Sequence, residues 1–397
     1  MRIPSPAPKP GTRLRDEDAD DIAPGLFEAL RGIPQDPRHH SEGDVETHVR
    51  LVADALLSSE AYAELDEKGR RIAFAAALLH DVGKPSRTKI EPDGSVTSRG
   101  HSPAGAILAR LALWRREIPI DEREAACRIV AAHQVPFRLM ERERPEAALI
   151  RLALDLDPAV LVAVAEADAR GRSTLDPSEA RKAIDAVLLL DVLRKDTFVE
   201  DAVAALKTAP PHARFTWAKD PLGRDPFSPV HDDRRGTLTL LCGPPGAGKD
   251  TWLRENAPSL PVVSLDAIRN ELRHPDPGIV VQEALERARA GLRSGRDFAW
   301  NSTNMTREQR GKILSLALDY RFSIRIVHLE QPEAELRARN AARKDAVPND
   351  AVDRFLSRWE APVPTEAHEL VLAGNDERKR ERGSKCLTGR RGNDERT

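Results

Sequence analysis

The segment 243–251 is the feature that most constrains how this 397-residue chain can fold. It reads GPPGAGKDT, it follows the apolar run TLTLLC at 237–242, and a helical pattern begins within it. In that context a glycine-rich turn directs backbone N–H groups at a phosphate, and the lysine reaches the β- and γ-phosphate oxygens. The segment therefore predicts a phosphate-binding loop (P-loop) after a buried strand. The residues expected to contact the nucleotide are Gly243, Pro244, Pro245, Gly246, Ala247, Gly248, Lys249, Asp250 and Thr251.

One position departs from the usual motif. The residue after the lysine is normally Ser or Thr, whose hydroxyl ligates magnesium, and a second strand supplies a carboxylate to the same ion. Here Asp250 follows Lys249, and the strand expected over 297–300 runs into Asn301. We interpret this as an exchange in which the carboxylate has moved from the strand to the loop. The expected ligand is a nucleoside triphosphate (ATP or GTP) with Mg²⁺, and the sequence does not fix the base.

The C-terminal part alternates strand-like and helix-like segments. Apolar runs at 237–242, 260–264, 297–300 and 323–329 are separated by helical stretches. This alternation predicts an α/β domain with a parallel sheet over residues 237–374. The charged residues 375–397 are expected to form a disordered tail.

Two polar clusters indicate the type of kinase. Asp266 and Arg269 are three residues apart, on one face of an expected helix, where a carboxylate could take a proton from an attacking hydroxyl and an arginine could bind a phosphate of the acceptor. Arg339 and Arg343 are spaced i, i+4 on a further expected helix and could close over the transferring phosphoryl group.

The P-loop, Asp266-x-x-Arg269, the sequence NSTN at 301–304, and Arg339-x-x-x-Arg343 followed by Val-Pro occur in that order. Over about residues 237–372 this order resembles the 5′-hydroxyl polynucleotide kinases of phage type. The resemblance implies that Asp266 is the general base and that Arg269 holds the 3′-phosphate of the acceptor. It also implies that Arg339 and Arg343 are lid arginines.

The N-terminal half shows helical periodicity from about residue 22 to residue 195 and no convincing strand, which predicts an all-α bundle over 22–196. Residues 1–21 are rich in proline and charge and are expected to be a disordered leader. Residues 197–236 contain several prolines and are expected to be a linker.

Six histidine and aspartate residues stand at helix positions or helix ends in this half. Side chains from several helices can converge in a bundle core, and a mixed nitrogen and oxygen set suits Mn, Fe, Co, Ni or Zn. A bound ion of this kind makes hydroxide available near neutral pH for attack on phosphorus. The candidate ligands are His48, His80, Asp81, His101, His133 and Asp168.

The order H…HD…D, with HDVGK at 80–84, resembles the HD phosphohydrolase superfamily over about residues 38–175. The resemblance implies that His48, His80, Asp81 and Asp168 bind a first ion. It implies that His101 and His133 complete a second site or hold the phosphate, and that Lys84 neutralises phosphate charge; one or two ions remain possible. Within the superfamily, GKPSRT and GHSPAGA are similar to HD domains attached to bacterial tRNA nucleotidyltransferases. No GGxVRD motif of a nucleotidyltransferase is present.

The tandem order resembles the bacterial bifunctional end-healing enzymes called HD-Pnk. This implies phosphorylation of 5′-hydroxyl RNA or DNA ends and metal-dependent hydrolysis of 2′,3′-cyclic phosphate or 2′-phosphate ends. A separate polynucleotide ligase would seal the ends, because no KxDG motif is present. Two alternatives remain open. One is a small-metabolite kinase fused to a nucleotide or cyclic-nucleotide phosphohydrolase, and the other is a nucleotide-sensing regulator.

Bulk composition adds little. The net charge of −2 gives no overall positive field for nucleic acid, so contacts with a phosphodiester chain would depend on local arginines. No apolar run approaches the roughly 20 residues that cross a bilayer, and the three cysteines are widely spaced. A soluble, cytoplasmic protein without a membrane partner is expected.

Overall fold

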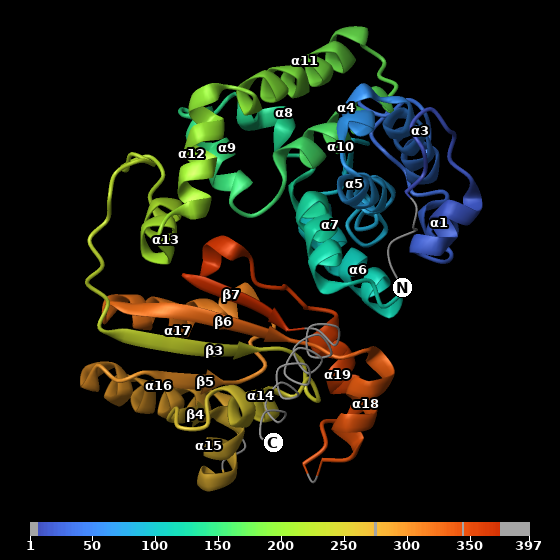
Figure 1. Cartoon of the computed structure of the whole chain (residues 1–397). Helices are drawn as coiled ribbons and strands as arrows, with labels where there is room; N and C mark the ends of the chain where they lie inside the picture. The colour runs from blue at the N-terminus through green and yellow to red at the C-terminus, as the bar shows by residue number, and fades with distance from the viewer. Residues whose placement is uncertain (1–6, 274–275, 344, 374–397) are drawn as a thin grey trace, which may run out of the picture. The chain divides into compact units, whose positions relative to one another are not determined.

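The computed structural model describes residues 7–273, 276–343 and 345–373. The chain divides into two compact units, residues 1–231 and 232–397, each with its own core (Figure 1). The expected multidomain architecture, an all-α bundle followed by an α/β domain with a parallel sheet, is confirmed. The tail expected over 375–397 lies outside the described residues.

The first unit is built mainly of helices. In its described residues these are α1 (Asp16–Ile22), α2 (Leu26–Leu30), α3 (Val45–Ser58), α4 (Glu60–Glu64), α5 (Glu67–Leu79), η1 (Lys84–Ser86), α6 (His101–Arg115), α7 (Ile120–Ala132), α8 (Pro136–Leu139), α9 (Pro145–Ala153), α10 (Pro158–Arg170), α11 (Pro177–Arg194), α12 (Thr197–Thr208) and α13 (Pro211–Lys219).

Helix α5 is the centre of the bundle, in contact with α3, α7 and α10 (Figure 1). Every residue from Ile72 to Leu79 is buried, four of them alanines, so the helix is apolar on all sides, as expected of a central helix. Asp44, Asp66 and Asp157 cap α3, α5 and α10 by accepting hydrogen bonds from backbone N–H groups of the first turn.

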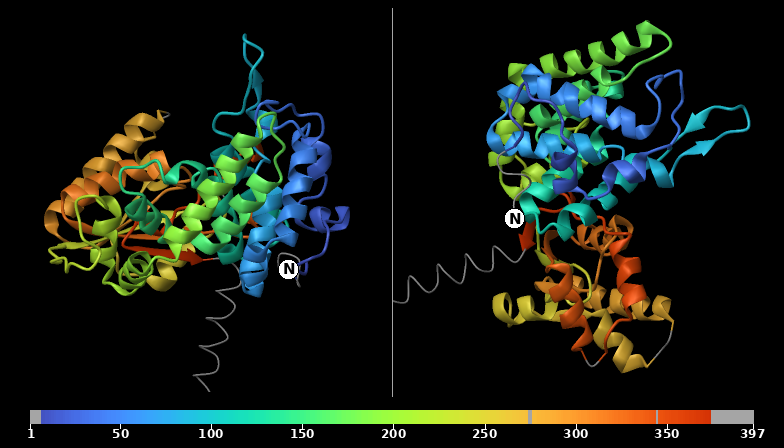
Figure 2. Two further views of the ribbon diagram at one scale, coloured as in Figure 1. Left: turned by 90° about the horizontal axis from the view of Figure 1, so that it is seen from above. Right: turned by 90° about the vertical axis from the view of Figure 1, so that its right-hand side faces the viewer.

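The expectation of no strand in this unit is wrong at one place. β1 (Lys89–Ile90) and β2 (Val96–Thr97) form a short antiparallel hairpin, which projects from the helices in Figure 2. The signal was an Asp93-Gly94 turn, in which Gly94 has a φ of 80°. Two-residue strands are too short to give a visible alternation of apolar and polar residues.

The expected disordered leader, 1–21, is wrong for its described part, residues 7–21. The backbone N–H of Gly11 donates to the carbonyl of Leu57 at 2.6 Å, and the hydroxyl of Tyr62 donates to the carbonyl of Pro8 at 2.7 Å. Helix α1 then buries Ala19 and Ile22 in the core of the bundle. The polar composition of this segment did not predict its order, because tertiary contacts hold it in place.

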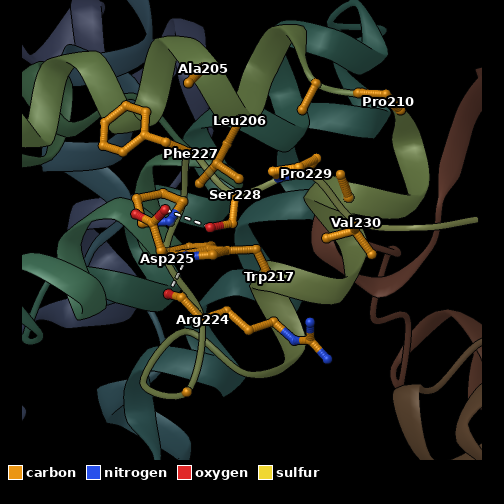
Figure 3. Close-up of a pocket in the computed structure, with 14 residues that line it drawn as sticks. Ala205, Leu206, Pro210, Trp217, Arg224, Asp225, Phe227, Ser228, Pro229 and Val230 are labelled. Atoms are coloured by element: carbon orange, nitrogen blue, oxygen red, sulfur yellow. Dashed lines mark hydrogen bonds between the residues drawn. The ribbon is translucent and has the colours of Figure 1, made fainter.

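The expected linker 197–236 is also largely wrong, because residues up to 231 belong to the helical unit. Asp196 caps α12, whose residues Val199, Ala202 and Leu206 are buried at helical spacing. After α13 the chain folds back: the indole N–H of Trp217 donates to the carbonyl of Arg224 at 3.2 Å. Figure 3 shows this segment lining a pocket against α12 and α13.

The second unit is a five-stranded parallel sheet with helices packed against it (Figure 1). Its elements are β3 (Gly236–Cys242), α14 (Lys249–Asn256), β4 (Val262–Ser264), α15 (Leu265–Leu272), α16 (Pro277–Ser294), β5 (Phe298–Asn301), α17 (Arg307–Asp319), β6 (Phe322–Leu329), α18 (Glu333–Ala341), α19 (Asn349–Leu356), η2 (Pro364–Glu366) and β7 (Glu369–Ala373).

The strand order is β4-β5-β3-β6-β7, so the strand before the P-loop lies in the middle of the sheet. The four expected strands are confirmed with small shifts of their ends. The edge strand β7, which pairs with β6, was not expected. Because all strands are parallel, the carboxyl ends of β3, β4 and β5 share one edge, where ligands bind in open α/β sheets.

Candidate active sites

Three candidate metal ligands from distant parts of the helical unit meet in its core. His48 comes from α3, His80 follows the last residue of α5, and Asp168 comes from the last turn of α10. Nε2 of His48 lies 3.1 Å from Oδ1 of Asp168 and 3.3 Å from Nε2 of His80. These three donor atoms lie within 4.8 Å of one another and could hold one ion.

A second group of three lies beside the first. It consists of Asp81, His101 at the start of α6, and His133 directly after α7. Nε2 of His101 lies 3.3 Å from Nε2 of His133 and 3.3 Å from Oδ1 of Asp81. All six sequence-predicted ligands are therefore brought together, in two sets of three.

Asp81 faces both sets. Its Oδ2 lies 3.2 Å from Nε2 of His80 and 3.7 Å from Nε2 of His48, whereas its Oδ1 points to His101 and His133. One carboxylate thus offers a different oxygen to each set. Asp81 could therefore contribute a ligand atom to either set.

Backbone carbonyls fix the orientation of three of the histidines. Nδ1 of His80, His101 and His133 each lies 2.7 Å from the carbonyl oxygen three residues earlier in the chain. Because a carbonyl only accepts, Nδ1 of each ring donates the hydrogen bond and Nε2 faces the cluster. A second hydrogen bond of this kind is typical of metal-binding histidines.

His48 is oriented by a carboxylate instead. Its Nδ1 lies 2.9 Å from Oε1 of Glu42, and Nδ1 of His40 lies 2.8 Å from the same oxygen. The other oxygen of Glu42 accepts from the backbone N–H of Ser173 at 2.9 Å. No role was expected for Glu42; its position six residues before a candidate ligand histidine was the available signal.

Two close backbone approaches set the spacing of the helices that carry the ligands. A Cβ on Gly83 would lie 2.2 Å from the carbonyl oxygen of His101, so the HDVGK turn packs directly on the start of α6. A Cβ on Gly171 would lie 2.7 Å from the Val52 side chain and 2.8 Å from its backbone nitrogen, which brings α10 against α3. Side chains larger than hydrogen would separate these ligand-bearing segments.

The two aspartates are held as anions. Burial favours the neutral form of Asp81, but Lys84 and His80 outweigh it, and the pKa of Asp81 lies well below its usual value. Burial acts in the same way on Asp168, and the nearby Arg172 and His48 outweigh it, so its pKa is also well below the usual value. Ionised carboxylates are the form that binds metal ions.

The pKa values of His80, His101 and His133 are shifted in different directions. Burial lowers the pKa of His133 to about 3 and also lowers the pKa of His101, so both rings are neutral near pH 7. Burial opposes protonation of His80 as well, but Asp81 and Asp168 outweigh it and raise its pKa. The centre therefore favours positive charge next to its two carboxylates, as a cation site requires.

Two cations flank the cluster. Nζ of Lys84 lies 2.7 Å from Oδ2 of Asp81 and donates to the side chain of Gln35 at 2.6 Å. Arg172, which the sequence analysis missed, makes a two-pronged contact with Asp168 and stacks on Phe137 with its guanidinium carbon 4.5 Å from the ring centroid. The i, i+4 spacing from Asp168 to Arg172 was the available signal.

The cluster opens into a cleft of about 1170 Å³. Five of the six ligands, all except His80, line the cleft together with Lys84, and the lining also includes Phe137, Arg138 and Arg99. A space of this size accommodates more than a single phosphate.

The predicted P-loop joins β3 to α14 in the second unit. Gly243, Gly246 and Gly248 have φ angles of 144°, 85° and 91°, which only glycine adopts easily. A Cβ on Gly243 would lie 2.1 Å from the carbonyl of Leu329, and one on Gly246 would lie 2.5 Å from that of Leu336. Gly248 precedes the first turn of α14, whose N-terminus is available for an anion.

Lys249 already points back over the loop. Its Nζ donates to the carbonyls of Gly243 at 2.8 Å and Pro244 at 3.1 Å. Burial lowers the pKa of Lys249 to about 8 although the neighbouring Asp250 opposes the shift. A phosphate that contacts this ammonium would favour its charged form.

Asp250 and Asn301 are in contact. The side-chain amide of Asn301 donates to Oδ1 of Asp250 at 2.6 Å, although the two residues are 51 positions apart. Asn301 is the last residue of β5 and pairs in register with Leu241 of β3, beside the start of the P-loop. The two positions that depart from the usual magnesium-binding pattern therefore adjoin each other.

The candidate base lies among arginines. Oδ1 of Asp266, in the first turn of α15, lies 2.7 Å from Arg269, and its Oδ2 lies 3.5 Å from Arg343. Arg339 is instead paired with Glu335 of its own helix. Of the four residues assigned to transfer and acceptor binding, three are together, and Arg339 is engaged elsewhere.

The expected single helix carrying Arg339 and Arg343 is not observed. Helix α18 ends at Ala341, and Arg343 lies in the following loop. The side chain of Asn340 causes the break, because it donates to the carbonyl of Val347 at 2.7 Å and accepts from the N–H of Val347 at 3.2 Å. The two arginines therefore do not share a helical face.

The NSTN segment makes hydrogen bonds to the residues around the start of the P-loop. The side chain of Asn304 donates to the carbonyl of Leu241 at 2.6 Å, and the carbonyl of Thr303 accepts from the N–H of Gly243 at 2.9 Å. Asn304 has a φ of 48°, which asparagine tolerates better than most residues. Asn304 and Thr303 therefore hold the backbone on either side of the start of the P-loop.

Comparison with known proteins agrees with this division. Residues 45–169 match the family model of the HD domain, and residues 238–362 match that of an AAA domain. The chain joins an HD domain to a P-loop kinase-like domain. Among the described residues, no helix is long and apolar enough to cross a membrane.

Curated relatives match part of the chain. A Multifunctional CCA protein from Halorhodospira halophila (strain DSM 244 / SL1) is 35% identical over 115 residues, 29% of this chain and 25% of that protein. A Multifunctional CCA protein from Burkholderia ambifaria (strain MC40-6) is 30% identical over 208 residues, 49% of this chain and 47% of that protein. This chain therefore spans less than half the length of these relatives.

Among solved structures, a putative kinase from Chloroflexus aurantiacus j-10-fl is 17% identical in sequence. It aligns with a TM-score of 0.31 and covers 40% of this chain and 98% of that one.

Proposed function

We propose that this chain heals the broken ends of nucleic acids. The C-terminal domain transfers a phosphoryl group from ATP or GTP to a 5′-hydroxyl of RNA or DNA. The HD domain hydrolyses a 2′,3′-cyclic phosphate or 2′-phosphate. The observation that carries the proposal is that one chain holds two phosphate-type sites. The first has six metal-type ligands in two adjacent sets of three, five of them lining a cleft, and the second is a P-loop with a candidate base between two arginines.

The donor atoms of the HD domain fit two divalent transition ions. A bound ion of this class lowers the pKa of a water molecule and so supplies hydroxide for attack on phosphorus. The side chains then have distinct tasks. The four histidines and two aspartates would hold the ion or ions, and Lys84 and Arg172 would balance the negative charge of the phosphate and of the aspartates.

In the kinase domain the P-loop amides and Lys249 would hold the donor phosphates, and Mg²⁺, when bound with the nucleotide, would supply charge neutralisation there. Asp266 accepts the proton of the attacking 5′-hydroxyl. Arg269 binds a phosphate of the acceptor strand, and Arg343 lies close enough to Asp266 to contact the transferring group. Arg339 would have to leave Glu335 to join them.

An RNA oligonucleotide with a 5′-hydroxyl and a 2′,3′-cyclic phosphate tests both activities at once. We expect incubation with ATP or GTP and Mg²⁺ or Mn²⁺ to add a phosphate at the 5′ end and to open or remove the cyclic phosphate, as read by mass spectrometry of the intact strand. The same RNA with a 5′-phosphate controls for phosphate addition elsewhere, and a DNA strand tests the choice of sugar.

Asp266→Asn distinguishes the two activities in this assay. It keeps the size of the side chain and removes the candidate base, so 5′ phosphorylation should be lost while the 3′ end is still processed. If the wild-type chain leaves every 5′-hydroxyl strand unmodified but phosphorylates small hydroxyl compounds, the alternative of a metabolite kinase fused to a nucleotide phosphohydrolase replaces this proposal. Sealing of the healed ends would require a separate polynucleotide ligase.

A further inference from the structure

The contact between Asp250 and Asn301 lies where nucleotide kinases hold magnesium. In the usual P-loop arrangement a Ser or Thr after the lysine and a carboxylate at the end of a second strand both ligate the ion. In this chain the loop residue is an aspartate and the strand residue is an asparagine, and they share a 2.6 Å hydrogen bond. Both positions therefore differ from the usual motif: the loop position has a carboxylate in place of a hydroxyl, and the strand position has an amide in place of a carboxylate.

We propose that Asp250 supplies the carboxylate for the magnesium ion of the bound nucleotide and that Asn301 positions it, so that the negative charge of the site has moved from strand to loop. This inference rests on the nucleotide-binding part of the proposed function and not on the identity of the phosphate acceptor.

The geometry fits this exchange in three respects. Only Oδ1 of Asp250 accepts the hydrogen bond from Asn301, so Oδ2 is not used by that contact. Asp250 is exposed in the first turn of α14, whereas the side chain behind it, Asn301, is buried. The charge is displaced by about one hydrogen-bond length, which keeps it beside the phosphates that the P-loop holds.

The chemistry of the ion also fits. Mg²⁺ prefers oxygen ligands and is held by one or two carboxylates together with phosphate oxygens and water. A neutral asparagine in place of the strand carboxylate removes the repulsion that two adjacent carboxylates would create. The other candidate carboxylate at this edge, Asp266, is already paired with Arg269 and approached by Arg343.

Isosteric substitutions of the full-length protein test the exchange. Asp250→Asn removes the charge and keeps the shape, and the double variant D250N/N301D returns one charge to the pair at the other position. The readout is the dissociation constant of a fluorescent ATP analogue, measured with and without Mg²⁺. The constant without Mg²⁺ divided by the constant with Mg²⁺ measures how strongly the site couples the ion to the nucleotide.

We expect D250N to reduce this ratio by at least about tenfold while affinity without Mg²⁺ falls little, because the P-loop and Lys249 are intact. D250N/N301D should recover most of the ratio. Asp266→Asn is the matched control, because it removes a neighbouring carboxylate and should keep the ratio even though phosphoryl transfer is lost.

Three outcomes would overturn the proposal. The ratio could be unchanged in D250N with both affinities intact, or unchanged because D250N weakens binding equally with and without Mg²⁺, as a purely structural role predicts. The ratio could also remain as low in D250N/N301D as in D250N. The assay contains no acceptor. A protein that couples Mg²⁺ to ATP as described but does not phosphorylate 5′-hydroxyl ends would contradict the proposed function and leave this inference standing.

Discussion

The HD centre and the P-loop handle the same chemical group but are held together in opposite ways. The P-loop residues occupy nine consecutive positions, and their geometry follows from one strand, one turn and one helix. The HD ligands come from five helices or helix ends spread over 121 positions, from His48 to Asp168. The first site depends on local backbone conformation, and the second depends on how helices pack.

The two sites also differ in how far their side chains are exposed to solvent. The side chains of His48, His80, His133 and Asp168 are 1% exposed each, whereas those of Asp266 and Arg269 are 66% and 49% exposed. A buried cluster of ionisable groups is costly unless its charges are compensated, so the HD centre couples strongly to folding. The part of the kinase-like domain that carries Asp266 and Arg269 is instead open to solvent. The predictions below test whether the two sites are as independent as this contrast implies.

The largest effects are expected from two substitutions, one in each site, that each remove one activity and spare the other. Asp81→Ala removes the oxygen atoms that face both ligand sets and should lower phosphoesterase activity by more than about 100-fold, since even an outer-shell partner is worth 10 to 100-fold. Lys249→Ala should abolish 5′ phosphorylation by a similar factor. Each variant should keep the other activity within about twofold, as measured on separate single-end substrates. Loss of kinase activity in Asp81→Ala in the presence of Mg²⁺ would mean that the domains are coupled.

Removal of divalent ions should distinguish the units by stability. An ion that binds only the folded state adds about 2.7 kcal/mol at a hundred times its dissociation constant. Chelation should therefore lower the melting temperature of the helical unit by about 5–10 °C, and the kinase unit should melt as before. Scanning calorimetry of the full-length protein measures both transitions, and Asp81→Ala assigns them because its helical transition should no longer respond. Equal shifts of both transitions would contradict the contrast between the sites.

Local patterns in the sequence predicted local structure, and this explains what could be anticipated. The spacing of the glycines predicted the P-loop, because each of these positions needs a backbone conformation or a close approach that favours glycine. Gly248, for example, has a φ of 91°. The order of the HD residues indicated the ligands, and all six do converge. The order could not indicate that Asp81 divides its oxygens between two sets, because that depends on the directions of helices distant in sequence.

The errors have the same origin. The leader and the linker were expected to lack structure because they are polar and proline-rich, yet Ala19 and Leu206 are buried in cores formed by other segments. Arg343 was expected on a helix that Asn340 ends through its contacts with Val347. Tertiary contacts decided each case, and single-segment patterns do not record them.

The close approach of Gly83 to α6 allows a test at the backbone level. Gly83→Ala would place a Cβ 2.2 Å from the carbonyl of His101 and 2.6 Å from the nitrogen of Gly105, and neither backbone atom can rotate away. We expect a loss of about 1–3 kcal/mol in the free energy of unfolding of the helical unit, together with weaker phosphoesterase activity.

A matched glycine in the other unit provides the control. Gly311 lies within α17, and nothing is within 4 Å of its added Cβ. Gly311→Ala should therefore be neutral or stabilising by up to about 1 kcal/mol, since alanine is the better helix former. Denaturant unfolding of both variants gives the comparison. A Gly83→Ala protein as stable and active as the wild type would show that α6 can shift without disturbing the ligands.

The smallest expected effect concerns Glu42, which orients a ligand without facing the cluster itself. Glu42→Gln keeps the size of the side chain but removes the charge that stands 2.9 Å from Nδ1 of His48. Outer-shell partners of this kind are worth about 10–100-fold in metal affinity. We therefore expect the Mn²⁺ concentration for half-maximal phosphoesterase activity to rise by that factor, with most activity regained at saturating Mn²⁺.

Glu46→Gln is the matched control, because Glu46 lies in the same part of the chain but is paired with Arg31 and Arg50. It should leave the Mn²⁺ dependence unchanged. A loss of maximal rate in Glu42→Gln that added Mn²⁺ does not restore would place Glu42 in the catalytic step, because a residue that acts only through the orientation of His48 affects occupancy of the site and is compensated by mass action. Recovery at high Mn²⁺ would instead show that the HD centre, unlike the P-loop, is tuned by residues outside its ligand set.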